Sequence, residues 1–431
     1  MSPKKPQYYP SPRWSGEILD CSVPLSFDQF SRCSYDCAYC FSFFQRAVAT
    51  VNPIYKTKEK LYSADEARPV NVDRVCRLFR GEIPGDQFWP FISRRYYLQW
   101  GGLSDPFDEF ERRKGVALEI LRTMDEVRQP ICFSTKGTWW TEDERYMRLF
   151  RRNRDIWNVK FSIINLDEGR SRRVETGCPS PAERLAAIRR LVRDTGAKAT
   201  LRLRPFIIGM SDVEGEYLEL VRRAREAGAG ALSTEFFCME GRCIDQSRYD
   251  RMSKALGFDM PEFYRQNSMK KGGYMRLNWR IKQPYIEEME RMCRRIKMRF
   301  YVSDAHWKGR SCNGSCCGLL SSENYHRGQY TEALLIARRK GRVRWGDIEP
   351  LIEPSFRKLK AVESVNFMRG SPSIRAKFYH FSLFDMMRYF WNNPKAEKSP
   401  YRYFSGAMAP VGKDENGDLI YEYRGLGDET P

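Results

Sequence analysis

The sequence predicts an α/β protein, a partial barrel of six βα units followed by a mainly helical, basic C-terminal extension. Between about residues 95 and 240, short β-type runs alternate with amphipathic helical stretches, which is typical of βα units around a parallel sheet. Beyond residue 240 the pattern changes to helices with basic faces. A complete eight-unit barrel needs more units than the sequence supplies, so the six-unit form fits better.

The clearest βα unit spans residues 158–206. Apolar residues over 159–164 predict a strand, and Ser180 and Glu183 supply the N-cap and the capping-box carboxylate of a helix. Gly196 ends this helix, and the next strand follows directly. We expect the other strands within 18–27 and at 97–100, 131–134, 199–207 and 231–237.

The second half of the chain predicts a different organisation. Helices are expected over 285–299, 332–340 and 372–391, and a β-hairpin is expected from 409–413 and 418–423 around Asn416-Gly417. The chain thus divides into a flexible N-terminal segment (1–14), the partial barrel (15–240), a cysteine-containing extension (241–330) and a basic, aromatic-rich helical region with a terminal hairpin (331–431).

The composition indicates a globular protein with a basic surface. Of the 431 residues 42% are hydrophobic, and the formal net charge is +19 with a sequence pI of about 9.4. This charge favours a polyanionic partner, usually nucleic acid, and the alternative is a solvated basic surface without a specific partner. Arginine and lysine clusters lie near aromatic residues that suit unstacked bases, namely Trp345, Tyr389, Trp391, Tyr401, Tyr403 and Phe404.

The sequence shows no sign of membrane insertion or secretion. Its longest apolar runs, such as 206–210 and 333–337, fall far short of the roughly 18 residues of a membrane span. The polar, Pro-rich start has no apolar stretch behind it, so we expect a cytoplasmic protein. In that compartment the 13 cysteines are interpreted as thiols and metal ligands rather than disulfides.

Three cysteines, Cys33, Cys37 and Cys40, lie close together in a loop after a strand-like segment. A four-iron cluster bound by three thiolates keeps one iron open, as catalytic metal sites generally keep a position open for substrate. S-adenosylmethionine (SAM) can occupy that iron and, once reduced, release a 5′-deoxyadenosyl radical. The spacing therefore predicts a 4Fe–4S cluster and SAM as cofactors. A structural zinc site, with Cys21 folding back as fourth ligand, is the alternative.

The spacing Cys-x-x-x-Cys-x-x-Cys, with an aromatic residue on each side of the last cysteine, resembles the radical SAM superfamily. Further motifs follow in the order and spacing of its spore photoproduct lyase-like branch, over about residues 15 to 240. The resemblance implies that the partial barrel is a radical SAM barrel. Its later motifs lie at 101–107 (GGLSDPF), 134–137 (STKG), 160–163 (KFSI), Glu175, 179–181 (PSP), 184–185 (RL) and 204–212 (RPFIIGMSD).

The resemblance also implies SAM contacts at the strand ends. Two glycines would let the methionine part approach the backbone, Lys136 would pair with its carboxylate, and Ser162 would hydrogen-bond the carboxylate or the ribose. The alternatives are an ordinary turn, a solvated loop charge, a strand hydroxyl and, at Arg204, a buried ion pair. The expected SAM-binding set is Gly101, Gly102, Ser104, Asp105, Lys136, Ser162 and Arg204.

One position departs from the lyase that the chain resembles. That enzyme has a tyrosine directly after its last cluster cysteine, in a radical relay with a hydrogen-donating cysteine. Here Phe41 takes that position and Tyr39 is retained. Because a phenyl ring has no phenolic hydrogen, the same relay is not expected. Tyr39 and Cys132 are the candidate catalytic residues, and a buried core cysteine is the alternative for Cys132.

A second group of candidate ligands lies in the Gly-rich stretch near residue 312. It predicts a second iron-sulfur cluster or a zinc ion; the alternatives are pocket thiols, including a hydrogen donor, and a structural role. The group consists of His306, Cys312, Cys316 and Cys317, with Cys238, Cys243 or Cys293 as a candidate extra ligand.

The leading hypothesis is a radical SAM enzyme of the lyase, isomerase or modifying type. It would abstract hydrogen from a nucleic acid, with DNA favoured, for lesion repair or rearrangement of a modified base, and would receive electrons from a reductant such as flavodoxin or ferredoxin. The first alternative is radical SAM modification of a peptide or small metabolite. The second is a nucleic-acid-binding protein whose cluster is structural or redox-sensing.

Overall fold

The structure is a computed structural model that describes residues 8–42, 67–241, 246–271, 274–320, 324–364 and 372–425. Its centre is an eight-stranded sheet with the order β1-β2-β4-β5-β6-β8-β9-β13. The strands from β2 to β13 are parallel, and β1 pairs antiparallel with β2 at one edge. The strands are β1 (Arg13–Trp14), β2 (Leu25–Phe27), β4 (Leu98–Trp100), β5 (Ile131–Thr135), β6 (Trp157–Ser162), β8 (Lys198–Phe206), β9 (Ala231–Phe236) and β13 (Arg299–Val302).

This sheet confirms the predicted fold class, and its described strands form no closed barrel. The six predicted strands correspond to β2, β4, β5, β6, β8 and β9. The first is shorter than expected, because only residues 25–27 pair, while Ile18 and Leu19 are buried in a turn. β13 adds a seventh parallel strand beyond residue 240. Its four residues follow a basic helix directly, so their pattern is too short to be recognised in the sequence.

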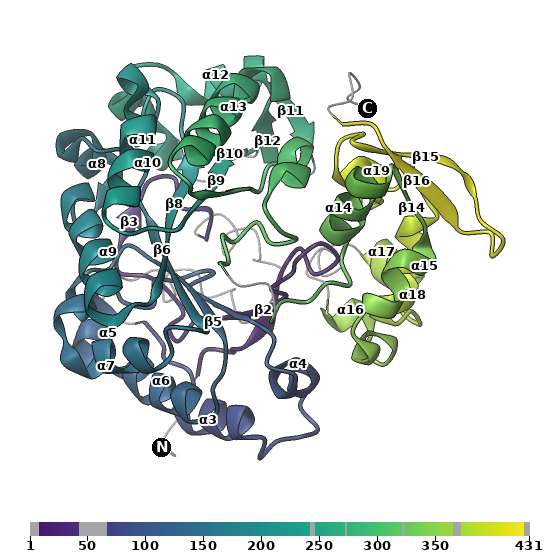
Figure 1. The fold of residues 1–431 in the computed structure, drawn as a ribbon, viewed down its shortest axis with the longest axis horizontal. Coiled ribbons are helices and arrows are strands. Elements are labelled where there is room, and N and C mark those ends of the chain that lie inside the picture. The colour runs from purple at the N-terminus through teal and green to yellow at the C-terminus, as the bar shows by residue number, and fades with distance from the viewer. Residues whose placement is uncertain are drawn as a thin grey trace.

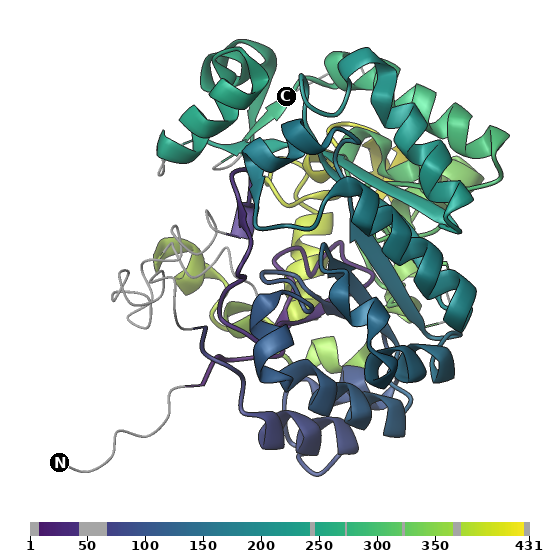
Figure 2. The ribbon, with the colours of Figure 1, turned by 90° about the vertical axis from the view of Figure 1, so that its left-hand side faces the viewer.

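Helices lie along the outer side of this sheet (Figure 1), and Figure 2 shows the same arrangement from the side. In α9 the predicted capping box is present: Ser180 Oγ accepts from Glu183 N at 3.2 Å, and Glu183 Oε2 accepts from Ser180 N at 2.6 Å. None of the described helices has the length and apolar character needed to cross a membrane. The helices of this half are α3 (Val72–Arg80), α4 (Trp89–Ser93), α5 (Glu109–Lys114), α6 (Val116–Glu126), η3 (Trp139–Glu142), α7 (Glu144–Arg152), α8 (Glu168–Val174), α9 (Pro181–Thr195), η4 (Val213–Gly215), α10 (Glu216–Glu226), α11 (Gln246–Leu256), α12 (Met260–Asn267), α13 (Trp279–Arg295) and η5 (Ala305–Arg310).

The two faces of the sheet differ in chemistry. Alternate side chains point to opposite faces of a strand. One set is apolar and packs beneath the helices, as Phe133 does against Phe150 of α7 with ring centroids 5.2 Å apart. The other set forms what we call the inner face, and it is polar although the sheet is parallel, a type whose strands are usually apolar on both sides. The inner face includes Gln99, Ser134, Lys160, Ser162, Thr200, Arg202, Arg204, Ser233 and Glu235.

The C-terminal region forms a separate group of helices with a small sheet, at the right of Figure 1. The hairpin forms where the sequence predicts it, from β15 (Met408–Lys413) and β16 (Leu419–Tyr423). The helix expected over 372–391 is two helices, because Ser382 starts a new capping box. The other elements are α14 (Tyr330–Lys340), β14 (Arg342–Val343), α15 (Trp345–Ile348), η6 (Glu349–Leu351), η7 (Pro354–Arg357), α16 (Ala361–Ser364), α17 (Pro372–Lys377), α18 (Leu383–Trp391) and α19 (Pro400–Tyr403).

The C-terminal region is fastened to the start of the chain through Asp20, whose side chain is buried. Asp20 accepts hydrogen bonds from Lys308 and, at 2.5 Å, from Thr331 Oγ1, and Tyr330 N donates to Leu19 O at 3.0 Å. Two further small sheets complete the described structure. They are β3 (Asp36–Cys37) with β7 (Glu175–Thr176), and β10 (Cys238–Glu240), β12 (Tyr274–Leu277) and β11 (Ser268–Lys271).

Candidate active site

The loop that carries the three predicted cluster cysteines is held by backbone pairing. Strand β3 pairs antiparallel with β7, and Ala38 N donates to Val174 O at 2.8 Å. Cys40 N donates to Cys37 O at 3.1 Å, which closes a turn between two of the cysteines. Cys37 is buried, whereas Cys33 and Cys40 are partly exposed. The loop is therefore fixed by residues far along the chain, as the pairing of Asp36 with Thr176 illustrates.

Two arginine side chains of α11 form hydrogen bonds and ion pairs with the outer side of this loop. Arg248 donates to Asp36 Oδ1 and to Cys37 O, each at 2.8 Å. Arg251 donates to Asp36 Oδ2 at 2.7 Å and to Asp36 O at 3.0 Å. Although burial raises the pKa of Asp36, the two guanidinium groups outweigh it and leave the pKa below its usual value. The sequence offers no signal for this clamp, because Asp36 and Arg248 are 212 residues apart along the chain.

A buried carboxylate, Glu175, organises the other side of the loop. Tyr39 OH and the Arg184 guanidinium both bind it, and Ser171 Oγ donates to it at 2.9 Å. Arg184 and Glu175 each have side chains only 1% exposed. Burial raises the pKa of Glu175, but the charges of Arg184 and Lys136 lower it by a larger amount, so the pKa lies below its usual value. Tyr39, predicted as catalytic, is thus placed as a buried hydrogen-bond donor to Glu175.

Lys136 lies beside the cysteine loop at the end of β5. Its Nζ is 5.5 Å from the centroid of the Tyr39 ring. Burial alone would lower its pKa, but the negative charges of Cys37, Glu175 and Cys178 raise the pKa above the ordinary value. This places a cation near the Cys37 thiol of the loop, which suits an anionic group bound there.

The conformation of the neighbouring loops depends on Asp105, Ser104 and the two glycines. Asp105 accepts from Thr135 Oγ1 at 2.7 Å and from Lys136 N at 2.6 Å, so its carboxylate positions Lys136. Ser104 N donates to Asp28 Oδ1 at 2.9 Å. A Cβ on Gly101 would overlap the carbonyl oxygen of Ser134, and one on Gly102 would lie 2.6 Å from Ser26 Oγ. Packing against backbone therefore already requires a glycine at 101, whereas the side-chain ends near Gly102 could shift, and the contact of both glycines with SAM stays a prediction.

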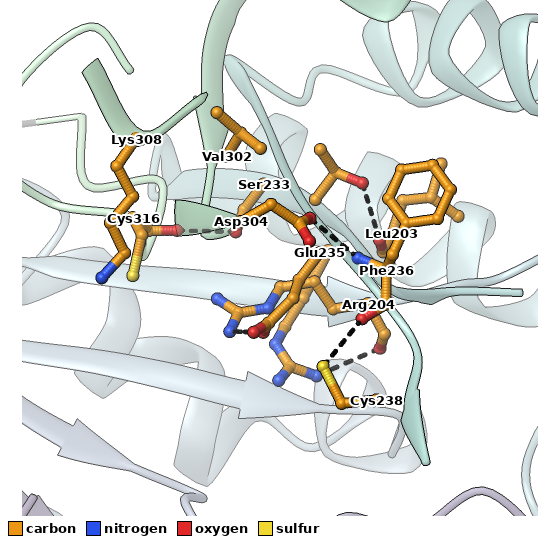
Figure 3. A network of polar contacts seen from close by, with 12 residues as sticks. Leu203, Arg204, Ser233, Glu235, Phe236, Cys238, Val302, Asp304, Lys308 and Cys316 are labelled. Carbon is orange, nitrogen blue, oxygen red and sulfur yellow. Dashed lines mark hydrogen bonds and ion pairs between the residues drawn. The ribbon is translucent and has the colours of Figure 1, made fainter. Parts of the chain in front are cut away.

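The remaining predicted SAM ligands lie on the inner face. Ser162 Oγ accepts from Arg202 at 3.2 Å, and its carbonyl accepts from Arg184 at 2.7 Å. Arg204 forms an ion pair with Glu235, as Figure 3 shows, which is the alternative interpretation that the sequence left open. The pKa of Glu235 is raised by burial and lowered more strongly by Arg204, ending below its usual value. On the inner face Arg204 is thus paired with a carboxylate, whereas Lys160 donates to the amide oxygen of Gln99 at 2.5 Å.

Two further cysteines bear on the site. Cys132, predicted as catalytic, is fully buried in β5, and burial raises its pKa. Cys178, which sequence reasoning missed, has its sulfur 3.7 Å from that of Cys37. It lies just before residues 179–181, which were interpreted as a helix start and as one motif of the family resemblance, and neither interpretation pointed to the cluster loop.

The second group of candidate ligands does not come together. Cys312 is exposed, whereas Cys316 and Cys317 face inwards, and the His306 ring lies 5.5 Å from that of Trp307. Throughout the part of the chain that the structure describes, no three His, Cys, Asp or Glu side chains are placed to hold one metal ion. The physical reason is that the backbone at Cys316 is hydrogen-bonded to the sheet, whereas Cys312 is exposed to solvent. Of the candidate extra ligands, Cys243 lies outside the described residues.

The three cysteines of the loop fit an iron-sulfur cluster by their chemistry. They are thiols, which iron-sulfur clusters require, and each would bind a different iron, so they need not converge on one atom as the ligands of a single ion do. The neighbouring cation, Lys136, fits the negative charge of such a group and of a bound carboxylate.

The basic surface is less available than the sequence suggested. Trp345, Trp391 and Phe404 are buried, with exposures of 1%, 0% and 0%, because they form the core of the C-terminal region. They are therefore not placed to stack on bases, contrary to the expectation. Several arginines of the basic surface are also paired with carboxylates, namely Arg151 with Glu144, Arg152 with Asp125, Arg172 with Glu168, Arg294 with Glu290, and Arg342 with Glu422.

Comparison with known proteins identifies the fold. No family model and no curated protein match the sequence. Among solved structures, a point mutant of spore photoproduct lyase matches with a TM-score of 0.50 and 15% identity over 68% of this chain and 80% of that chain. Streptococcus suis SuiB matches less well, with a TM-score of 0.38 and 12% identity over 65% of this chain and 50% of that chain. The chain therefore shares the fold of spore photoproduct lyase, in agreement with the α/β fold class that the sequence predicts.

Proposed function

We propose that the chain is a radical SAM enzyme that binds a 4Fe–4S cluster through Cys33, Cys37 and Cys40. The observation that carries the proposal is the three-cysteine loop with Lys136 beside it, in a fold shared with spore photoproduct lyase. When bound, the cluster and SAM supply a 5′-deoxyadenosyl radical, which removes hydrogen from carbon.

The chain's own residues have supporting roles in this proposal. Lys136 holds the carboxylate of SAM by its charge, and Asp105 sets the position of Lys136 through its backbone N–H. Glu175 and Arg184 hold the loop from within the protein, and Arg248 and Arg251 hold it from outside. Tyr39 stays a neutral phenol in this setting, since burial raises its pKa well above the ordinary value.

The substrate that we propose is a nucleic acid. The support is the net charge of +19, since the buried tryptophans no longer contribute to the argument. Modification of a peptide or small metabolite is the competing outcome of the test below, as is a nucleic-acid-binding protein with a structural or redox-sensing cluster.

The test is anaerobic incubation of the iron-loaded protein with SAM and a reductant such as flavodoxin, ferredoxin or dithionite. We expect 5′-deoxyadenosine from the wild type and none from Cys37→Ala, with Cys312→Ala as the matched control that retains it. Absence of 5′-deoxyadenosine from a wild type with an intact cluster would overturn the proposal. Mass spectrometry of nucleosides from cells with and without the active protein then tests the substrate, and unchanged nucleosides would favour a peptide or metabolite.

A further inference from the structure

Two cationic side chains, Lys160 and Arg202, lie next to each other on the inner face. Strands β6 and β8 pair in register, so that Lys160 is opposite Thr200 and Ser162 is opposite Arg202. Alternate residues of a strand share a face, which makes Lys160 and Arg202 diagonal neighbours. Diagonal neighbours in a sheet are close enough for long side chains to contact the same ligand.

The ammonium group of Lys160 is buried next to an uncharged partner. The residue is 2% exposed, and its Nζ donates to Gln99 Oε1 at 2.5 Å. The amide N–H groups of Gln99 donate to Ser134 Oγ and to Trp100 O, each at 3.1 Å, which leaves the amide oxygen for Lys160. A lysine is almost never fully buried unless it is paired, because removing its charge from water is costly. Lys160 therefore calls for an anion.

The guanidinium group of Arg202 is also bound by uncharged groups. Within the described residues both of its hydrogen bonds use Nη1, which donates to Ser162 Oγ at 3.2 Å and to Arg204 O at 3.4 Å. Its Nε and Nη2 form another edge of the guanidinium, and such an edge binds two oxygens of one anion through parallel hydrogen bonds. Arg202 is partly exposed on the inner face, so a ligand can reach it.

The carboxylates on this side of the sheet are bound by other cations. Glu235 pairs with Arg204, Asp304 pairs with Lys282, and Asp20 pairs with Lys308. Among the residues that the structure describes, neither Lys160 nor Arg202 forms an ion pair with a carboxylate. The inner face thus has two adjacent positive charges that the protein leaves unbalanced.

Resting on the proposed function, we propose that Lys160 and Arg202 bind a phosphate group of the nucleic-acid substrate. The charged oxygens of a phosphate point in different directions, so they can accept from the Arg202 edge and from Lys160 at once. The two oxygens of a carboxylate lie in one plane and fit the guanidinium edge alone. Arg202 also contacts Ser162, a predicted SAM ligand, so the bound phosphate belongs to the nucleotide that reacts.

The first experiment measures phosphate binding without turnover. The iron-loaded protein is melted at constant ionic strength with millimolar inorganic phosphate, dimethyl phosphate or acetate. A ligand that binds the folded protein alone raises its melting temperature. We expect inorganic phosphate to raise the melting temperature of the wild type and acetate to leave it unchanged. A matching rise with dimethyl phosphate assigns the site to a backbone phosphodiester, and no such rise assigns it to a terminal phosphate. An equal rise with acetate, or none with inorganic phosphate, would overturn the proposal.

Matched variants locate the binding site. Lys160→Met and Arg202→Gln should each lose most of the rise, and Arg202→Lys, which keeps the charge without the two-point edge, should retain part of it. Arg189→Gln removes an exposed arginine of α9 and should retain the full rise. A full rise in both Lys160→Met and Arg202→Gln would show that phosphate binds elsewhere. Lys160 also acts on the Cys317 thiol, and a rise that appears in Cys317→Ser but not in the wild type would show that a thiolate balances Lys160 instead.

The second experiment separates the phosphate site from the SAM site. SAM added to the wild type should leave the phosphate-dependent rise in place, because the SAM carboxylate is assigned to Lys136. A rise that disappears with SAM would assign Arg202 to the cofactor and end the proposal.

In complemented cells we expect the protein-dependent nucleoside to fall to background with Arg202→Gln and to persist with Arg189→Gln. Full product formation by Arg202→Gln would count against the phosphate site alone. A wild type that releases no 5′-deoxyadenosine would contradict the proposed function, whereas phosphate binding is measured without SAM cleavage and is judged separately.

Discussion

The sulfur of Cys178 lies 3.7 Å from the sulfur of Cys37, so a fourth thiol touches the loop of the three predicted cluster ligands. A fourth cysteine ligand would close the open iron that SAM needs. The radical SAM proposal therefore requires that Cys178 is a neighbour of the cluster and not a ligand.

We accordingly expect Cys178→Ala to keep about four irons per chain after anaerobic reconstitution, the content of one cluster with three cysteine ligands. Cys37→Ala should lose most of this iron. Iron and sulfide quantitation is the measurement, with the exposed Cys312→Ala as control. A Cys178→Ala protein that cannot hold iron would identify Cys178 as a ligand and close the site to SAM. About eight irons in the wild type would indicate a second cluster.

Glu175→Gln should destabilise the fold strongly. The substitution leaves the buried guanidinium of Arg184 without its counter-charge, and breaking a buried ion pair in this way costs about 3–5 kcal/mol. Glu168→Gln, which removes the exposed partner of Arg172, is the control and should cost at most about 1 kcal/mol. Urea unfolding gives both values, and equal effects of the two substitutions would contradict the prediction.

The ion pair between Glu175 and Arg184 also predicts how the stability of the fold depends on pH. The pKa of Glu175 in the folded protein lies below its ordinary value of 4.5, owing to Arg184 and Lys136. A carboxylate with a lowered pKa stabilises the fold above its unfolded pKa, and this contribution is lost as the pH falls towards the folded pKa. We expect the difference in unfolding free energy between wild type and Glu175→Gln to shrink below about pH 4.5, measured by denaturant titration.

The buried His326 is a second group that makes the stability of the fold depend on pH. Burial lowers its pKa from 6.5 to about 3, and its Nε2 accepts from Glu353 N at 3.2 Å. Because the folded protein holds this imidazole neutral, stability is complete above pH 6.5 and falls at lower pH by about 1.4 kcal/mol per pH unit. His326→Gln should flatten the profile between about pH 6.5 and 4, and an unchanged slope in circular dichroism unfolding would refute this.

The arginine clamp on Asp36 should slow loss of the cluster. Arg248→Ala removes hydrogen bonds to Asp36 and to the carbonyl of Cys37, so the loop should open more often. We expect iron release to a chelator to accelerate about tenfold, the equivalent of roughly 1.4 kcal/mol from lost charge-assisted hydrogen bonds. Arg265→Ala, which breaks an exposed pair with Glu262, serves as control and should not change the release rate.

The proposed nucleic-acid substrate predicts a steep salt dependence. If cationic side chains neutralise phosphates, the logarithm of the binding constant should fall with the logarithm of salt concentration by about 0.9 per phosphate contact on a duplex. Fluorescence anisotropy with a short DNA duplex and with a single strand measures this slope. Binding that is undetectable or indifferent to salt would exclude a polymeric nucleic acid and favour the peptide or metabolite alternative.

Local patterns predicted the fold well. The unit from β6 through α9 to β8 has its caps encoded within a few residues, such as Ser180 and Glu183, and the structure forms it as expected. β13 was missed because four residues after a basic helix carry too little alternation. The single helix expected over 372–391 was wrong because Ser382 begins a second one.

The site was harder to predict because its contacts are long-range. Cys33, Cys37 and Cys40 are neighbours in sequence, and so the loop could be recognised from spacing. Cys178 and Arg248 reach the same loop from 141 and 211 residues beyond Cys37, which no local pattern records. The expectation that aromatic residues of the basic region stack on bases was wrong for a related reason. A tryptophan that is close to an arginine in sequence can lie on either the buried or the exposed face of its helix.

The fastening of Asp20 also has a consequence for the order in which the protein is completed. Its two partners, Lys308 and Thr331, are separated from it by 288 and 311 residues. A ribosome must therefore synthesise most of the chain before the turn that carries Asp20 acquires its final neighbours. Until then this carboxylate lacks both side-chain partners, and the buried surface around it is exposed to other polypeptides. Premature termination before residue 308 should consequently give an aggregating product rather than a smaller working enzyme.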